Sequence, residues 1–191
     1  MHPEQYLLER DPVIGKIIEA NEARWPNCIS EDPVWGLVRM VLAQQVSTLV
    51  ANRRSQRVLS VAPLFARGCA GQHANVVQVF LRAGATRRQA KCCAEILATE
   101  RLIRPVVSRA FRDDAPELRI SGIGPWTLAV FRILVLREPD VLPEADVGLI
   151  RAFQIAYGRR ASLTRRAKTW RPFRSIAVWH LWMSLGNEVL G

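Results

Sequence analysis

The sequence predicts an all-α protein, and the pattern of its apolar residues carries that prediction. Val13, Ile14, Ile17 and Ile18 recur at the spacing that places them on one face of a helix. No segment alternates apolar and polar residues as a half-buried strand would, and no hairpin-turn signal joins two such segments. The chain has 191 residues, which is long enough for one sizeable core.

Caps, prolines and glycines predict where the helices begin and end. Ser30-Glu31-Asp32-Pro33 is typical of a helix start. Asp146 follows a turn at Pro143 and is predicted to cap a helix that runs to about Tyr157. The other predicted helices are the one with the apolar face at 13–18, a basic helix around 53–57, two helices over 74–83 and 86–98, a short helix near 114–120, a longer one near 125–136, and a last one over about 173–187.

The segment from Leu118 to Asp146 holds the most informative pattern. A short apolar stretch leads into Gly122-Ile123-Gly124, where two glycines predict a tight hairpin with positive φ angles. Pro125 then suits the first position of a helix. The amides of the hairpin and of the new helix are expected to point outward at a helix N-terminus, which is a site for a phosphate. A single acid, Asp146, lies twenty residues after Trp126.

The charge of the chain indicates a polyanionic partner. There are 27 basic and 17 acidic residues, which gives a formal net charge of +10. The basic residues are arginines except for Lys16, Lys91 and Lys168. Residues 159–174 carry seven bases and no acid, so this run is either a solvated face or a phosphate-facing one.

The sequence gives no sign of a metal cluster or a membrane segment. The cysteines are at 28, 69, 92 and 93, a spacing that fits no zinc pattern, and we expect reduced structural thiols. No secretory signal pattern and no apolar run of 18 residues is present. We therefore expect a cytoplasmic protein with no membrane partner.

Three blocks in order resemble the helix-hairpin-helix (HhH-GPD) DNA glycosylases. The first is Val41-Leu42-Ala43-Gln44-Gln45-Val46-Ser47, the second is the hairpin followed by Asp146, and the third is Trp170-Arg171-Pro172-Phe173-Arg174-Ser175 with Trp182 beyond it. The resemblance covers roughly residues 10–188 and is closest to the alkylpurine branch, the 3-methyladenine DNA glycosylase II enzymes. It implies one domain over residues 1–191, without an additional N-terminal α/β domain, in which two helical lobes surround a cleft.

The resemblance implies that Asp146 is the catalytic carboxylate of a base excision repair enzyme. Breaking an N-glycosidic bond builds positive charge on the deoxyribose, which a nearby carboxylate stabilises while it orients the attacking water. A helix N-terminus favours the anion. The alternative is that Asp146 is only an N-cap, and Glu144 is the second candidate.

Other positions match residues that handle the damaged base. Trp126 and Trp182 are expected to form two walls of a pocket for a cationic alkylated purine, through stacking and cation–π attraction. Gln45 matches the position that fills the gap left by a flipped base. Gln44 is grouped with it as a base-binding candidate but is expected rather to hold the local backbone, and the alternative for both is two polar residues that end a helix. His180, between aromatic neighbours, is expected to be a satisfied structural histidine.

The hairpin block is expected to bind the DNA backbone. The DNA-contacting residues that the resemblance implies are Gly122, Ile123, Gly124, Thr127 and Ser47. Relatives also hold a monovalent cation with hairpin carbonyls, which here are those of Leu118, Ile120 and Ile123. No iron–sulfur cluster and no other cofactor is expected, because no cysteine follows Cys93. The expected partner is double-stranded DNA with a damaged base, bound by a monomer in the bacterial nucleoid.

The resemblance leaves the lesion open. Bifunctional relatives have a lysine where this chain has Trp126, so we expect a monofunctional enzyme without lyase activity. Relatives with a broad alkylbase pocket have tyrosines where this chain has Val130 and Val147, which leaves the lesion and the opposite-base preference undecided. The alternatives are a glycosylase for uracil, hypoxanthine or 8-oxoguanine, and a non-catalytic hairpin module that binds DNA.

Overall fold

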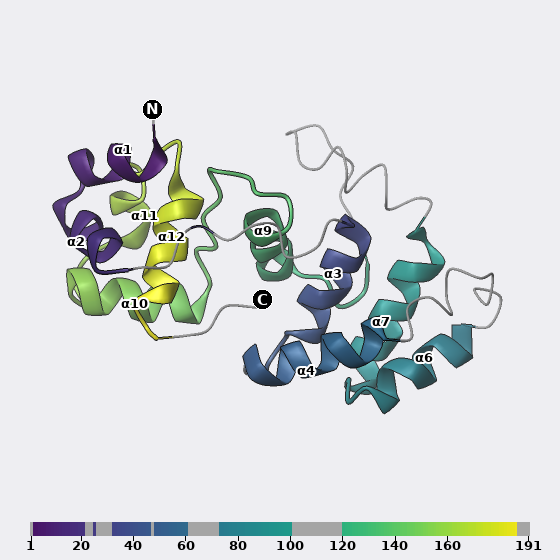
Figure 1. Cartoon of the computed structure of the whole chain (residues 1–191). Helices are drawn as coiled ribbons and strands as arrows, with labels where there is room; N and C mark the ends of the chain where they lie inside the picture. The colour runs from purple at the N-terminus through teal and green to yellow at the C-terminus, as the bar shows by residue number, and fades with distance from the viewer. Residues whose placement is uncertain are drawn as a thin grey trace. The chain divides into compact units, whose positions relative to one another are not determined.

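The structure is a computed structural model that describes residues 2–21, 25, 32–46, 48–60, 73–100 and 120–186. The regular secondary structure of these residues is helical throughout, and they contain no strand (Figure 1). The predicted all-α fold is therefore confirmed. The helices are α1 (Pro3–Arg10), α2 (Pro12–Ala20), α3 (Pro33–Leu42), α4 (Thr48–Leu59), α6 (His73–Arg82), α7 (Arg87–Ala98), α9 (Pro125–Leu134), α10 (Val147–Tyr157), α11 (Leu163–Arg166) and α12 (Arg174–Met183).

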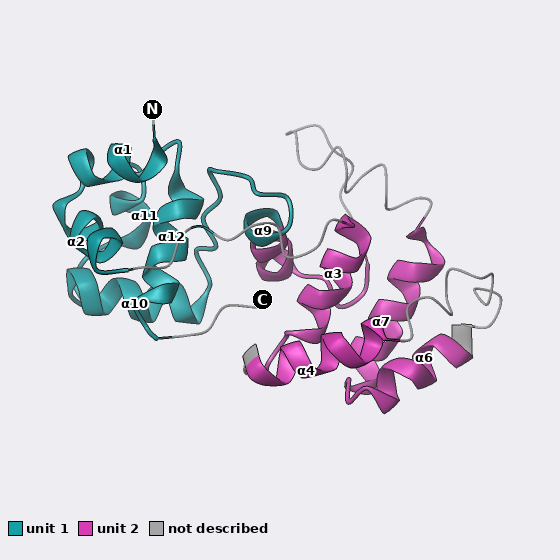
Figure 2. Cartoon of the chain, in the orientation of Figure 1, with its two compact units in different colours: residues 1–28, 132–189 teal, residues 29–131, 190–191 magenta. Residues whose placement is uncertain are grey.

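The chain divides into two compact units (Figure 2). Unit 1 joins the two ends of the chain, residues 1–28 and 132–189, and holds α1, α2, α10, α11 and α12. Unit 2 is the middle of the chain, residues 29–131 with 190–191, and holds α3, α4, α6 and α7. Helix α9 begins in unit 2, and its last three residues count with unit 1.

Helix α12 is the centre of unit 1. Its residues from Ser175 to Trp182 are all buried, because α1, α2 and α10 pack against it. A helix that is covered on every side can be apolar all round, and this explains why it carries two tryptophans and several aliphatic residues. The partners contribute Leu7, Ile14, Leu149 and Phe153 to the same core.

A buried carboxylate, Asp11, ties the first helices of unit 1 to its later segments. Its Oδ1 accepts hydrogen bonds from the backbone N–H groups of Val13 and Ile14 and so caps α2. Its Oδ2 accepts from the hydroxyl of Tyr157 and from the indole N–H of Trp170, each at 2.8 Å. Burial, and then the bond to Asp11, raise the pKa of Tyr157 far above its ordinary value. These partners compensate for removing the carboxylate from water.

Unit 2 is built on α3 and α7. Helix α3 packs on α4 and α7, and α6 packs on α7. Helix α3 begins where the Ser30–Pro33 pattern predicts a start, and Asp32 caps it, with the backbone N–H groups of Val34 and Trp35 donating to its carboxylate. Helix α7 begins with a reciprocal capping box between Thr86 and Gln89. These caps fix the starts of the two helices that support the hairpin.

The predicted helix boundaries hold to within a few residues, with two exceptions. The last helix ends at Met183 rather than near 187, because Ser184 to Gly186 form turns. Most of the short helix predicted near 114–120 lies outside the described residues, and Ile120 itself is not helical. Ser30 and Glu31, Cys28 and Cys69 also lie outside the described residues, whereas Cys92 and Cys93 are free and buried.

Candidate active site and hairpin

The hairpin of unit 2 is a tight turn closed by one backbone bond. The N–H of Ile123 donates to the carbonyl of Ile120 at 3.1 Å, and Gly122 has a φ of +99°. Gly124 is not among the positive-φ residues, so the prediction of positive φ at both glycines is wrong for Gly124. Its carbonyl instead accepts the N–H of Leu128 and starts α9. Only Gly122 therefore needs glycine for its backbone conformation.

The two glycines also differ in the space around them. A Cβ on Gly122 would lie 3.2 Å from Sγ of Cys92 on α7, whereas a Cβ on Gly124 would meet nothing within 4 Å. Burial raises the pKa of the Cys92 thiol to about 11, so this group packs under the turn as a neutral side chain. The open surface at Gly124 is the side on which another molecule has room to approach.

Gln44 fastens the end of α3 to the hairpin. Its side-chain amide donates to the carbonyl of Gly122 at 3.0 Å and to Oγ1 of Thr127 at 2.8 Å. The structure thus agrees with the expected backbone-holding role of Gln44, and a role in binding the base stays a prediction. Thr127 is only 2% exposed. Its side chain braces the hairpin from inside, and the DNA contact expected at this residue stays a prediction.

Gln89 on α7 completes this arrangement, and the sequence reasoning missed it. Its amide nitrogen donates to the carbonyls of Val41 and Gln44, both at 3.0 Å, at the end of α3. Its carbonyl oxygen accepts from Thr86 and from the guanidinium of Arg54. A buried amide with all these partners fixes the backbone that it touches. The capping-box spacing of Thr86 and Gln89 was the available sequence signal.

Gln45 has an unusual backbone directly after this fixed point. It is exposed and has a φ of +59°, which is sparsely populated by residues other than glycine. The cost of such a conformation is about 1–3 kcal/mol, and the surrounding bonds to Gln89 and Gln44 have to hold it. A side chain held outward in this way suits the predicted role of filling a gap in a base stack, which stays a prediction.

Asp146 in unit 1 is a buried carboxylate with defined partners. It is 8% exposed and caps α10 as predicted, because the backbone N–H of Leu149 donates to its Oδ1. The same oxygen accepts the indole N–H of Trp182 at 2.9 Å. Two donors from different elements thus orient the carboxylate. Glu144, the second candidate, is exposed at the surface, and no comparable pair of donors is seen on it within the described residues.

Trp182 and Gly148 shape the surroundings of this carboxylate. Trp182 is 9% exposed on α12, so its ring packs in unit 1 while its N–H serves Asp146. Gly148 is the second residue of α10, where a Cβ would be 3.2 Å from Oδ1 of Asp146 and 3.8 Å from Cδ1 of Trp182. Close approach therefore favours glycine at this position, which the sequence reasoning did not single out.

The remaining base-handling positions are distributed over the two units. Val147 is 78% exposed, next to Asp146, whereas Val130 is buried in α9. Trp126 is 36% exposed at the start of α9, in the part of this helix that belongs to unit 2. The pocket expected between Trp126 and Trp182 stays a prediction, since the two residues belong to different units.

Two predictions are not tested: the DNA contact at Ser47 and the cation held by carbonyls of the hairpin. Ser47 and Leu118 lie outside the described residues. The carbonyl of Ile120 is engaged by the N–H of Ile123 within the turn, and the monovalent cation at Leu118, Ile120 and Ile123 stays a prediction. Within the described ranges, no group of three or more histidine, cysteine, aspartate or glutamate side chains is arranged to hold a metal ion. Nor does any described helix have the length and apolar character needed to cross a membrane.

The third sequence block has structural roles. Trp170 is fully buried and donates to Asp11. The guanidinium of Arg174 makes a two-nitrogen contact with the carboxylate of Asp140. Ser175 accepts the N–H of Val141 at 2.9 Å. The last two contacts fix the segment just before Asp146, so this block contributes to the site by positioning.

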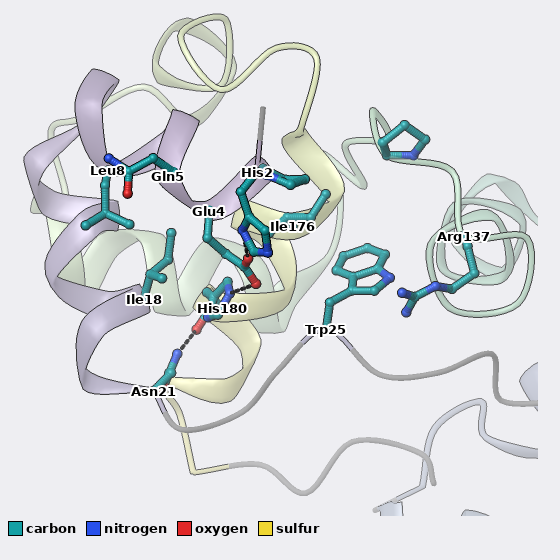
Figure 3. A pocket seen from close by; sticks show the side chains of 12 residues that line it. His2, Glu4, Gln5, Leu8, Ile18, Asn21, Trp25, Arg137, Ile176 and His180 are labelled. Atoms are coloured by element: carbon teal, nitrogen blue, oxygen red, sulfur yellow. Dashed lines mark hydrogen bonds and ion pairs between the residues drawn. The ribbon is translucent and has the colours of Figure 1, made fainter.

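His180 faces away from this chemistry and lines a separate pocket of unit 1. The pocket has a volume of about 1040 Å³, with His2, Glu4, Asn21, Trp25 and His180 in its wall (Figure 3). The ring of His180 is buried as predicted, but neither ring nitrogen has a hydrogen-bond partner among the described residues, so the expectation of a satisfied histidine is wrong. Its Nε2 lies 3.8 Å from Oε1 of Glu4. Burial lowers the pKa of His180, and Glu4 opposes this shift.

Known proteins similar to this chain are DNA repair enzymes. No family model matches the chain. A "probable bifunctional transcriptional activator/DNA repair enzyme AlkA" of Mycobacterium tuberculosis is 29% identical over 199 aligned positions, which cover 95% of this chain and 39% of that protein. The chain therefore spans about two fifths of the length of this relative. DNA-3-methyladenine glycosylase 1 of Schizosaccharomyces pombe is 25% identical over 164 positions, 80% of this chain and 72% of that protein.

A solved structure has the same fold. It is that of a 3-methyladenine DNA glycosylase of Schizosaccharomyces pombe in complex with abasic DNA, with a TM-score of 0.75, 21% identity and coverage of 96% of each chain. Identity at this level shows the fold alone. In sequence and in fold, the chain is therefore similar to 3-methyladenine DNA glycosylases.

Proposed function

We propose that the chain is a monofunctional DNA glycosylase that hydrolyses the N-glycosidic bond of alkylated purines, such as 3-methyladenine, in duplex DNA. The observation that carries this proposal is the carboxylate of Asp146. It is buried at a helix N-terminus and held by the backbone of α10 and the indole N–H of Trp182. The names of the homologues supply the substrate class.

Asp146 serves the reaction by stabilising charge. As the bond between base and deoxyribose lengthens, positive charge develops on the sugar, and a carboxylate fixed in advance lowers the energy of that state. The same carboxylate orients the attacking water. The two donors on Oδ1 leave the carboxylate little freedom to rotate, so its position is set before the substrate arrives.

The hairpin and the end of α3 serve binding. The turn at Gly122–Gly124 is held by Gln44 and backed by Cys92, so its outward amides keep a fixed geometry for a phosphate of the DNA. Gln45, exposed and in a strained conformation, fills the space of the base that is rotated out of the duplex. Trp126 and Trp182 contact that base. The partner is double-stranded DNA containing a damaged base, and the protein acts as a monomer in the nucleoid of a bacterium.

The absence of lyase activity follows from the residue types. A Schiff-base mechanism needs an amine at the sugar C1′. The three lysines of the chain, Lys16, Lys91 and Lys168, all lie outside the segment from the hairpin to Asp146. Water is therefore the attacking group, and the product is an intact strand with an abasic site.

A panel of lesions tests the proposal. Duplexes with one hypoxanthine, uracil, 8-oxoguanine or ethenoadenine, and genomic DNA treated with a methylating agent, are incubated with excess protein, and base release is measured. Release of methylated purines ahead of the other bases supports the proposal. Faster release of uracil, hypoxanthine or 8-oxoguanine would assign the enzyme to that lesion. Val147 favours this second candidate function, because it is exposed beside Asp146 at a position where relatives with a broad alkylbase pocket have tyrosine. No release of any base, with DNA binding intact, would favour a non-catalytic module.

A further inference from the structure

The structure sorts the basic residues of segment 159–174 into two groups. One group is paired with buried or half-buried acids. Nε of Arg166 lies 3.9 Å from Oδ2 of Asp11, and Nε of Arg171 lies 3.9 Å from Oδ2 of Asp140, which also receives Arg174. These three arginines are therefore partly neutralised within unit 1.

The other group is exposed. It consists of Arg159, Arg160, Arg165 and Lys168. Within the described part of the chain, these four side chains make no ion pair and no hydrogen bond, and the segment that carries them contains no acid. Four uncompensated positive charges over ten residues are a local source of positive potential.

The part of the segment that carries these four charges, residues 159–168, is fixed at both ends. Tyr157 precedes it and Trp170 follows it, and both donate to the same carboxylate oxygen of Asp11. Between them, Ser162 caps the short helix α11, and Ala167 is buried in unit 1. The charges therefore project from an ordered loop, which loses less entropy on binding than a flexible tail.

We propose that Arg159, Arg160, Arg165 and Lys168 form a second binding surface for the DNA backbone, on unit 1, additional to the hairpin on unit 2. This inference rests on the proposed function for its partner. The exposed large apolar side chains of the described residues all lie outside this segment. The surface thus has neither a ring to stack on bases nor an apolar anchor for a lipid bilayer, and it fits phosphates without regard to sequence.

The test removes charge from this surface and compares it with equal removal elsewhere. The first variant carries Arg159→Gln, Arg160→Gln, Arg165→Gln and Lys168→Gln. The control also loses three arginines and one lysine, at exposed positions on α2, α6 and α7: Lys16→Gln, Arg82→Gln, Arg87→Gln and Arg88→Gln. Both proteins have the same net charge. Affinity for an undamaged duplex is measured between about 50 and 200 mM salt, and thermal melting verifies that both variants fold.

Counterion release sets the expected size of the effect. The logarithm of the binding constant falls with the logarithm of the salt concentration, and each phosphate contact makes this slope steeper by about 0.9. The loss of two to four contacts therefore makes the slope less steep by roughly 2–4. We expect the surface variant to bind undamaged duplex at least about tenfold more weakly at 0.1 M salt, with the control within about threefold of wild type. Because Asp146 and the hairpin are untouched, the excision rate with DNA saturated by protein is expected to stay within about twofold.

Three outcomes overturn the inference. Equal losses in both variants would reduce the effect to net charge, and unchanged affinity of the surface variant would show that the four residues do not touch DNA. Loss of binding to vesicles of anionic lipid, with duplex binding intact, would assign the surface to a membrane instead. The duplex measurement does not require base excision, so it remains decisive even if the wild type releases no base and the proposed function fails.

Discussion

Substituting alanine for each glycine of the hairpin separates folding of the turn from its contact with DNA. Gly122 has a φ of +99°, and a Cβ there would lie 3.2 Å from Sγ of Cys92. An alanine in such a conformation costs about 1–3 kcal/mol, and the contact with the thiol adds to that cost. For a chain of this length, about 2 kcal/mol corresponds to a fall in melting temperature of roughly 4–8 °C. Gly124 has neither constraint, so Gly124→Ala is expected to melt within about 1 °C of wild type.

DNA binding of the same pair gives the second half of the prediction. Both variants are expected to bind damaged and undamaged duplex more weakly. A Cβ on Gly124 obstructs a phosphate at the open side of the turn, whereas a Cβ on Gly122 presses on Cys92 and distorts the turn that presents the amides. The added variant Gly122→Ala with Cys92→Ala is expected to recover the part of the stability lost to the contact, and not the part lost to φ. The measurements are thermal melting and fluorescence anisotropy with the two duplexes. Weaker binding to the damaged duplex alone would mean that the hairpin reads bases, and a Gly124→Ala protein that binds normally would refute the phosphate contact.

Three further predictions concern the site and unit 1. Trp182→Phe keeps an aromatic ring but removes the indole N–H that donates to Asp146, and a hydrogen bond to a charged group is worth about 1.5–3 kcal/mol. We therefore expect single-turnover excision to slow by roughly 10–150-fold, with the affinity for undamaged duplex unchanged. A rate within threefold of wild type would contradict the role of this bond. Burial lowers the pKa of His180 in the folded state, so the unfolded chain binds a proton that the folded chain does not. The free energy of unfolding is therefore expected to fall as the pH drops below about 6.5. Denaturant titrations at several pH values are expected to show a smaller fall for His180→Gln. Borohydride added during excision is expected to trap no protein–DNA adduct, since no lysine lies between the hairpin and Asp146, and efficient trapping would disprove the monofunctional mechanism.

Local sequence signals predicted the elements of the site well. The apolar spacing, the Asp-Pro start of α3 and the Gly-Ile-Gly-Pro turn are all read within one or two helical turns of the chain. Asp146 was predicted as a cap for the same reason, because an N-cap bonds to a backbone N–H three residues away. The structure confirms these features with small shifts of boundary.

Contacts between distant segments could not be predicted in the same way. The bond from Trp182 to Asp146 joins residues 36 positions apart, and the bonds from Gln89 to the end of α3 span more than 40 positions. They depend on how helices pack, which no periodicity encodes. The hydroxyl of Thr127 is another example, since only the approach of Gln44 shows that it faces inward.

The glycines show the same limit. The sequence marks Gly122 and Gly124 as equivalent, but the presence of Cys92 below one and open space beside the other distinguishes them. Gly148 gave no signal in the sequence, because its constraint comes from the position of the Asp146 carboxylate, which Trp182 on another helix helps to hold. Glycine requirements that arise from packing become visible only once both surfaces are in place.

Excision by Asp146→Asn tests the central claim most directly. Asparagine has nearly the same shape and retains an oxygen for the donors of Leu149 and Trp182, but it carries no charge to stabilise the sugar cation. With methylated DNA and excess protein, we predict a single-turnover rate of base release several orders of magnitude below wild type, with affinity for undamaged duplex unchanged or slightly higher. A rate within about tenfold of wild type, which is about 1.4 kcal/mol in the barrier, would contradict the assignment of Asp146 as the catalytic carboxylate.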